Sequence, residues 1–156
     1  MKRETLWLVL GVLALLALGT GTAVVVYKMT RGLRNNNPGN IRHSSAAWQG
    51  MSVTQSDPAF VTFDDPAHGI RAMAVILKKY LARGVNTISE IIGTWAPPIE
   101  NNTAAYIAAV ANQTGIGAGS LIREQDLPAL ITAIIQHENN AQPYAADVIA
   151  HGVSLA

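Results

Sequence analysis

The hydropathy pattern begins with an uncharged apolar run over residues 6–27, LWLVLGVLALLALGTGTAVVVY. At about 1.5 Å per residue, a helix of this length would cross a hydrocarbon layer of about 30 Å. Trp7 and Tyr27 stand at its ends, where amphipathic rings favour a membrane interface. The run predicts one N-terminal transmembrane helix within residues 1–27. A cleaved signal peptide is the alternative, but the run continues past the small residues at 17–19.

Residues 28–34, KMTRGLR, form a short basic segment that predicts a linker. The remaining residues, 35–156, are enough to bury a core of their own and predict one domain. Within residues 40–63 the pattern changes to short extended segments separated by Gly, Ser, Asp and Pro. Such a pattern predicts a small antiparallel hairpin, with strands at about 40–43, 51–54 and 60–63.

After residue 63 the apolar positions follow the 3.6-residue period of amphipathic helices. Asp65 before Pro66 predicts the start of a long helix, and Thr87 with Glu90 forms a capping-box pattern for the next one. Helices are expected at about 66–83, 88–93, 102–115, 126–138 and 143–151. The pattern therefore predicts the α+β class, mostly helical with a small antiparallel hairpin.

Composition removes several functional classes. The formal net charge is only +1, which argues against a nucleic-acid-binding surface. The chain has no Cys, so disulfide and thiolate chemistry are excluded. Its four His show no metal-site spacing such as HExxH. We expect neither a metal ion nor another cofactor.

Glu138 is the first candidate for catalysis. It ends a strongly apolar helix, in AIIQHEN, one turn after Ile134 and Ile135 on the expected buried face. A carboxyl group at the rim of an apolar face, beside a negative helix end, is suited to act as a general acid. The alternative is a solvated Glu at a frayed helix end.

The segment WAPPIENNTAAY, residues 95–106, predicts a wall for a sugar-binding groove. A Trp ring would stack on sugar C–H faces, and Asn amides would bond hydroxyl and N-acetyl groups. Glu100 has an alternative role, because an acidic residue just before the positive N-terminal end of a helix stabilises that helix. The expected substrate contacts are Trp95, Glu100, Asn101, Asn102 and Tyr106.

The segment RGLRNNNPGNIR, residues 31–42, is rich in Asn around a Pro-Gly pair. Pro-Gly makes a tight turn, and Asn side chains bond the local backbone. Residues 40–42 would then border the groove as a strand, with Asn37 and Asn40 as substrate contacts. Alternatively, the Asn residues only cap and turn the chain as it leaves the linker.

These motifs carry a resemblance to known families. NNNPGNIR, WQG, FVTF and GIRAMA are together similar to a hairpin segment of glucosaminidase-type peptidoglycan hydrolases. RGLRNNNPGNIR, WAPPIENNTAAYI and AIIQHEN together resemble a family of bacteriophage virion-associated lysozyme-like proteins, over about residues 31–142. The resemblance implies a lysozyme-like fold and cleavage of the glycan strand of peptidoglycan. Lytic transglycosylases related to that family place the catalytic Glu in a helix end reading A-x-I-x-x-E-S, which implies the same role for Glu138.

The sequence departs from those relatives in two ways. Their Glu helix precedes the hairpin, whereas here it follows, so the domain is either permuted or has lost its acid. Permutation is tolerable because domain termini often lie close together. Asn139 stands where the relatives usually carry Ser, which affects the orientation of the carboxylate.

Together these features predict a membrane-anchored phage enzyme, a lytic transglycosylase or muramidase, that cleaves peptidoglycan when the phage penetrates or lyses its host. A lone Glu favours the transglycosylase, since a hydrolase needs a second carboxylate across the bond. The alternative is a non-catalytic, membrane-anchored virion structural protein whose lysozyme-like domain binds glycan. The expected partners are peptidoglycan, a lipid membrane contacted through residues 6–27, and capsid or vertex proteins. The expected location is a single-pass position in an internal virion membrane or the host envelope.

Overall fold

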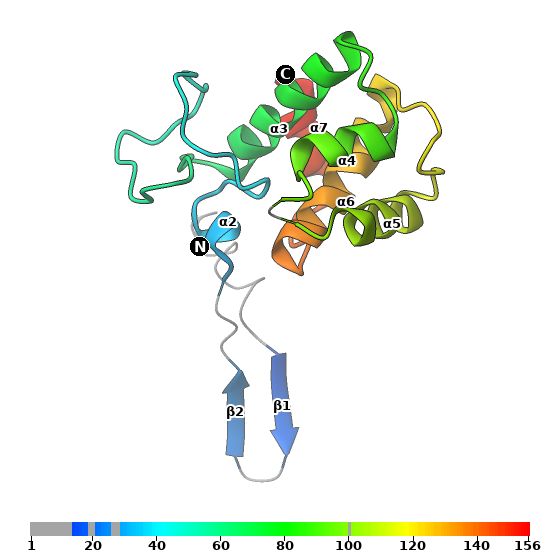
Figure 1. The fold of residues 1–156 in the computed structure, drawn as a ribbon. Helices are drawn as coiled ribbons and strands as arrows, with labels where there is room; N and C mark the ends of the chain where they lie inside the picture. The colour runs from blue at the N-terminus through cyan, green and yellow to red at the C-terminus, as the bar shows by residue number, and fades with distance from the viewer. Residues whose placement is uncertain (1–13, 19–20, 26–28, 100) are drawn as a thin grey trace. The chain divides into compact units, whose positions relative to one another are not determined.

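The computed structural model describes residues 14–18, 21–25, 29–99 and 101–156. It divides the chain into two units, Met1–Thr30 and Arg31–Ala156. Figure 1 labels their helices and strands in chain order. The division falls inside the segment predicted as a linker. The second half of that segment, Arg31–Arg34, is helix α2 and belongs to the second unit.

The described part of the first unit is a pair of antiparallel strands, β1 (Ala14–Leu18) and β2 (Gly21–Val25). The register pairs Ala14 with Val25 and Leu18 with Gly21. The predicted N-terminal transmembrane helix is therefore wrong for these residues. Glycine is unfavourable inside a helix, and the valines of this stretch fit a pleated strand.

No helix in the described ranges is both long and apolar enough to cross a membrane. This finding overturns the predicted single-pass membrane anchor and the location that was inferred from it. The rest of the predicted span, residues 6–13, 19–20 and 26–27, lies outside the described residues.

The second unit is helical, and local signals in the sequence start its main helices. Asp65 accepts a hydrogen bond from the Ala67 amide at the start of α3, and Thr87 and Glu90 close the capping box of α4. Both capping predictions are confirmed. The helices are α3 (Pro66–Ala82), α4 (Ile88–Trp95), α5 (Thr103–Thr114), the 3₁₀ turn η1 (Glu124–Asp126), α6 (Leu127–Asn139) and α7 (Ala146–Ser154).

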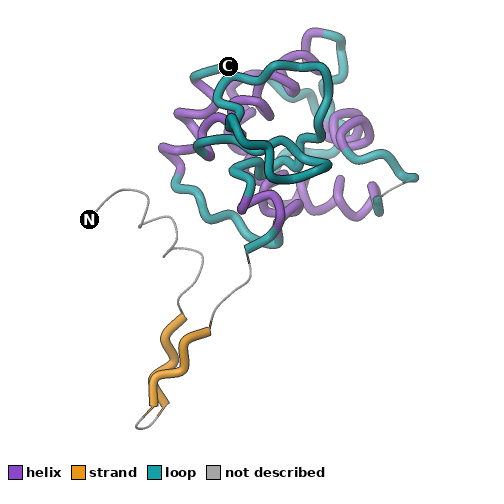
Figure 2. Tube along the Cα trace, turned by 90° about the vertical axis from the view of Figure 1, so that its left-hand side faces the viewer, coloured by secondary structure: helices purple, strands orange, loops and turns teal. Residues whose placement is uncertain are grey.

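The predicted hairpin within residues 40–63 is wrong. The described part of the second unit has no strand, only isolated antiparallel bridges, including Arg42 with Phe60 and Met51 with Phe63. Figure 2 shows this segment as loop. The prediction of an α+β fold with a small hairpin is therefore wrong for the described part of the second unit, which is helical with isolated bridges.

Side-chain amides explain why no regular ladder forms. Asn37 donates to the carbonyl oxygens of Ile41 and Val61 and accepts from the Ile41 amide. Gln55 donates to the Thr62 carbonyl and accepts from its amide. These side chains take the backbone groups that a neighbouring strand would otherwise bond.

The core of the second unit is centred on α6. This helix packs against α5, α7, α3 and α2. Its apolar face is fully buried, because hydrophobic residues recur at helical spacing along it. The apolar residues of this face end at residue 135, and the last turn of α6 carries the half-buried Glu138 and the buried polar residue Asn139. That face comprises Leu127, Leu130, Ile131, Ile134 and Ile135.

Candidate functional site

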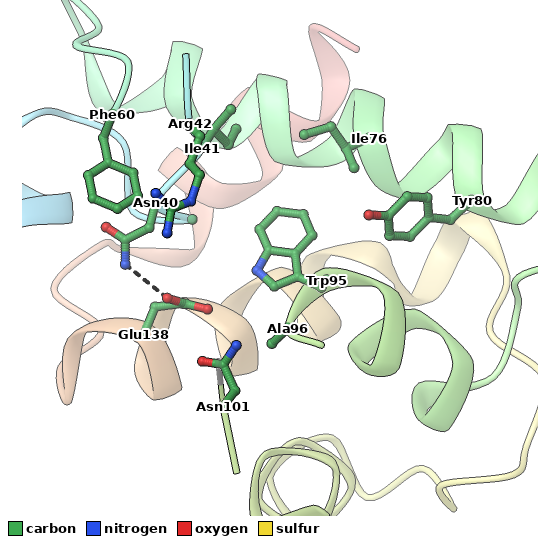
Figure 3. Close-up of a pocket in the computed structure, with 11 residues that line it drawn as sticks. Asn40, Ile41, Arg42, Phe60, Ile76, Tyr80, Trp95, Ala96, Asn101 and Glu138 are labelled. Atoms are coloured by element: carbon green, nitrogen blue, oxygen red, sulfur yellow. Dashed lines mark hydrogen bonds between the residues drawn. The ribbon is translucent and has the colours of Figure 1, made fainter. Parts of the chain in front are cut away.

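Glu138 lies in the last turn of α6, half-buried, and it faces a pocket of about 360 Å³. Figure 3 shows the pocket with residues from both ends of the domain sequence around it. Three of the other residues predicted to bind substrate also line it: Asn40, Trp95 and Asn101. The full lining is Gly39, Asn40, Ile41, Arg42, Phe60, Ile76, Tyr80, Trp95, Ala96, Asn101 and Glu138.

Two side chains hold the Glu138 carboxylate. The Asn40 side-chain amide donates to Oε2 at 2.8 Å, and the Tyr106 hydroxyl donates to Oε1 at 2.9 Å. Asn40 is 98 residues away in the chain, and Tyr106 is 32 residues away. Each carboxylate oxygen therefore has one donor from a different element, which fixes the orientation of the carboxylate at the pocket.

The Pro-Gly turn brings Asn40 to this position. The Asn40 backbone N–H donates to the Asn37 backbone carbonyl, and Asn40 has a left-handed backbone conformation with φ of 51°. Non-glycine residues rarely take this conformation, and Asn is among those that tolerate it best. A side chain at Gly39 would come within 3.0 Å of Met73 and Trp95, so glycine lets the turn approach the helices closely.

Asn139 ties the same turn to α6. It is buried, and its side-chain amide donates to the Pro38 carbonyl at 2.8 Å and to the Ile135 carbonyl at 3.0 Å. These bonds connect the backbone beside Asn40 to the helix end that carries Glu138. The Glu138 helix follows residues 40–63 in the chain, and yet the fold places Asn40 directly against Glu138.

Asn37 is not among the residues that line the pocket. Its side chain is fully buried, and its amide is used entirely by the backbone of residues 41 and 61. Asn102 caps α5, accepting a hydrogen bond from the Ala105 amide at 3.2 Å. Glu100 lies outside the described residues. Among the described residues, the predicted contacts therefore separate into those that line the pocket and those that lie outside its lining.

Tyr106 lies behind the pocket rather than in its lining. Its ring is buried and stacks on His137, with 3.6 Å between the ring centroids. Burial, and then the neighbouring Glu138 carboxylate, raise the pKa of Tyr106 well above its usual range. The hydroxyl therefore keeps its proton and remains a hydrogen-bond donor to Glu138.

Sequence reasoning missed several pocket residues. Ile76 and Tyr80 of α3 are not among the predicted substrate contacts, and both line the pocket. Arg42 belongs to residues 40–42, which were predicted to border the groove, whereas Phe60 was predicted only as a strand residue; both line the pocket. The pattern of apolar and polar residues does not predict which residues line the pocket, because it does not show which loop lies against the end of which helix.

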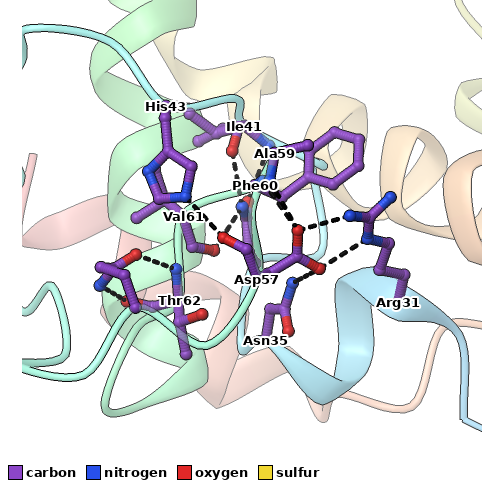
Figure 4. A network of polar contacts seen from close by, with 11 residues as sticks. Arg31, Asn35, Ile41, His43, Asp57, Ala59, Phe60, Val61 and Thr62 are labelled. Atoms are coloured by element: carbon purple, nitrogen blue, oxygen red, sulfur yellow. Dashed lines mark hydrogen bonds and ion pairs between the residues drawn. The ribbon is translucent and has the colours of Figure 1, made fainter.

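A second polar cluster holds Asp57, as Figure 4 shows. Arg31 binds its carboxylate through two nitrogens, both at 2.6 Å. Asn35 donates at 2.9 Å, and the amides of Ala59 and Phe60 each donate at 3.0 Å. The hydrogen bonds from Arg31, above all, hold the pKa of Asp57 well below its usual range.

Within the described ranges, no group of three or more His, Asp or Glu side chains is arranged to hold a metal ion.

Comparison with known proteins places the chain among phage proteins. No family model matches the sequence. Over 131 residues it is 44% identical to protein P5 of Pseudoalteromonas phage PM2, a match that covers 81% of this chain and 82% of the relative. The chain belongs to the family of this phage protein.

Proposed function

We propose that this phage protein cleaves the glycan strand of peptidoglycan, with Glu138 as its general acid and base. One observation carries the proposal: a half-buried carboxylate, held by two donors, faces a pocket large enough for sugar groups. The resemblance of the Asn-rich, Trp-Ala-Pro-Pro and AIIQHEN motifs to those of glycan-cleaving enzymes supports the choice of substrate.

The walls of the pocket offer the contacts that a sugar needs. Trp95 and Tyr80 present aromatic rings to which sugar C–H faces can pack. Asn40 and Asn101 present amides that can bond hydroxyl and N-acetyl groups. This mixture of apolar area and a few polar groups is typical of small-ligand sites.

The two partners of Glu138 determine where its proton can go. The Asn40 amide nitrogen only donates, and the Tyr106 hydroxyl keeps its own proton because its pKa is raised. Neither neighbour acts as a base toward a protonated Glu138. Proton transfer is therefore directed to a bound ligand, which is what general acid catalysis requires.

A lytic transglycosylase reaction fits one carboxylate. Glu138 gives its proton to the glycosidic oxygen as the bond to the muramic anomeric carbon breaks. The ionised Glu138 then takes the proton of the muramic C6 hydroxyl, whose oxygen attacks that carbon and forms a 1,6-anhydro end. Among the described lining residues Glu138 is the single carboxylate, whereas hydrolases normally use two.

Mass spectrometry of digested sacculi tests this reaction. The full-length chain should release fragments with 1,6-anhydro ends, and Glu138→Gln should release none. Glu124→Gln, a change at an exposed position outside the pocket, should behave as wild type. Fragments with ordinary reducing ends would show hydrolysis and reject the transglycosylase reaction.

A glycan-binding phage structural protein without turnover is the second candidate. Both Glu138 oxygens already accept hydrogen bonds from the protein, an arrangement that also suits a fixed acceptor for sugar hydroxyls. Binding of wild-type chain to sacculi with no released fragments would support this role and would reject the enzymatic proposal.

A further inference from the structure

We propose that Gly32 is a positioning residue for Glu138. Because Gly32 has no side chain, the Asn40 amide oxygen has space beside it, and the Asn40 amide nitrogen can donate to the Glu138 carboxylate. Gly32 is buried in α2 and lies outside the described lining of the pocket. The catalytic consequence rests on the proposed function, whereas the orientation of the carboxylate can be tested without it.

The orientation of the Asn40 amide follows from its partner. An ionised carboxylate only accepts hydrogen bonds, so the Asn40 amide nitrogen faces Glu138 and the amide oxygen faces another direction. Figure 3 shows this hydrogen bond between Asn40 and Glu138. The Asn40 oxygen lies beside α2, 2.8 Å from the point that a Cβ atom on Gly32 would occupy.

The Asn139 amide is oriented in the same way. Its nitrogen donates to the Pro38 and Ile135 carbonyls, so its oxygen faces away from these two acceptors. The Asn139 oxygen also lies 2.8 Å from the Cβ point of Gly32. Two amide oxygens, one from the Pro-Gly turn and one from the end of α6, therefore meet at a single glycine.

The backbone conformation of residue 32 does not require glycine. Its φ is not positive, and alanine is the better helix former. An added Cβ would instead meet the Asn40 and Asn139 oxygens closer than 3.0 Å, a distance that Cβ atoms do not tolerate. The Asn139 amide is buried and held by two hydrogen bonds, whereas Asn40 is half-buried. We therefore expect the Asn40 amide to be the group that moves.

Movement of the Asn40 amide would change the carboxylate directly. Glu138 would keep the Tyr106 hydrogen bond on Oε1 and lose the Asn40 hydrogen bond on Oε2. A carboxylate held at one oxygen can rotate about its last side-chain torsion. A general acid depends on its position relative to the bond that it protonates, so this rotation would lower the rate of the proposed reaction.

NMR of the ¹⁵N-labelled full-length chain tests the geometry without turnover. The side-chain NH₂ signals of Asn40 are assigned by their absence in Asn40→Gly, a change that suits the positive φ of this residue. Glu138→Gln shows how these signals move when the charge of the acceptor is removed. We expect Gly32→Ala to move them in the same direction. Gly93→Ala, the same change in α4 but with open space around the added Cβ, should leave them in place.

Asn40 signals that stay in place in Gly32→Ala would overturn the proposal. Gly32→Ala that folds only together with Asn40→Gly would support it, because removal of the displaced side chain then relieves the clash. Gly32→Ala that folds in neither background would reject it, since Gly32 would then serve the fold itself.

A double-mutant cycle on fragment release tests the catalytic consequence. Gly32→Ala should lower release about tenfold, which is the scale of one charge-assisted hydrogen bond. In the Asn40→Gly background the same change should cost nothing further, because the donor is already absent. Equal losses in both backgrounds would show a packing effect and overturn the positioning role. A wild-type chain that releases no fragments would reject the proposed function alone, since the NMR signals still decide the role of Gly32.

Discussion

The domain contains two carboxylates that are held in similar ways but placed differently. Asp57 is 8% exposed and accepts hydrogen bonds from Arg31, Asn35 and two backbone amides. Glu138 is half-buried, accepts from Asn40 and Tyr106, and faces a pocket of about 360 Å³. Both connect segments that are distant in the sequence.

The difference lies in the charge of the partners and in access. Asp57 forms an ion pair with Arg31, and hydrogen-bond donors surround its carboxylate oxygens, so no space remains there for a ligand. Glu138 has two neutral partners and an open side, so a ligand can reach it. A buried acid with a full set of partners is a structural element, whereas an oriented acid beside a cavity is a candidate for chemistry.

Glu138→Gln gives the largest expected effect and tests the open site. We expect release of glycan fragments to fall by a factor of about 100 or more, because a general acid–base group contributes on this scale. The midpoint of thermal unfolding should stay near that of wild type, since glutamine can still accept from Asn40 or Tyr106. Fragment release by mass spectrometry and unfolding by circular dichroism measure the two quantities. Retained activity would remove Glu138 from the mechanism.

Tyr106→Phe should reduce fragment release about tenfold, because Glu138 loses a donor worth about the energy of a hydrogen bond to a charged group. The ring and its stacking on His137 are kept, so unfolding should change little. Tyr144→Phe is the matched control, since Tyr144 is also buried, at 8% exposed against 2% for Tyr106, and is not one of the two donors to Glu138. An equal loss in both variants would show a packing effect rather than positioning of the carboxylate.

Asp57→Asn tests the closed cluster. The new amide group would face the donors of Arg31 or Asn35, and the guanidinium would lose its counter-charge. We expect the unfolding midpoint to fall by roughly 5 °C, with Asp64→Asn, an exposed change, as the control. A midpoint equal to that of the control would mean that the cluster does not stabilise the domain.

The smallest expected effect is a change with pH in the difference between the unfolding midpoints of wild type and Asp57→Asn. The pKa of Asp57 is lowered from its ordinary value of 3.8, so the unfolded state binds the proton more readily. The stability that Asp57 contributes is therefore present above about pH 4 and is lost as the pH falls below it. The midpoints of wild type and Asp57→Asn should therefore begin to converge below about pH 4 and continue to converge down to about pH 2. A constant difference over this range would contradict the depressed pKa.

Local signals predicted the helices well. A cap followed by an apolar stripe places the starts of α3 and α4, because those interactions involve residues within one or two turns. The same reasoning put Glu138 at the end of a buried helix face. It failed for the apolar N-terminal run, where a helix and a strand pair both satisfy the hydropathy. It failed again at residues 40–63, where Asn37 and Gln55 take the backbone groups of a ladder.

The sequence by itself determined which residues form the amphipathic helices and where an acid ends one of them, because these depend on neighbours close in the chain. Only the tertiary structure decided that Asn40 would orient Glu138, that Asn37 would be buried in the wall, and that Arg42 would share the pocket. Those outcomes depend on the approach of a glycine turn to α3 and α6, which joins residues 98 positions apart. Contacts of that range arise from packing, which no local pattern encodes.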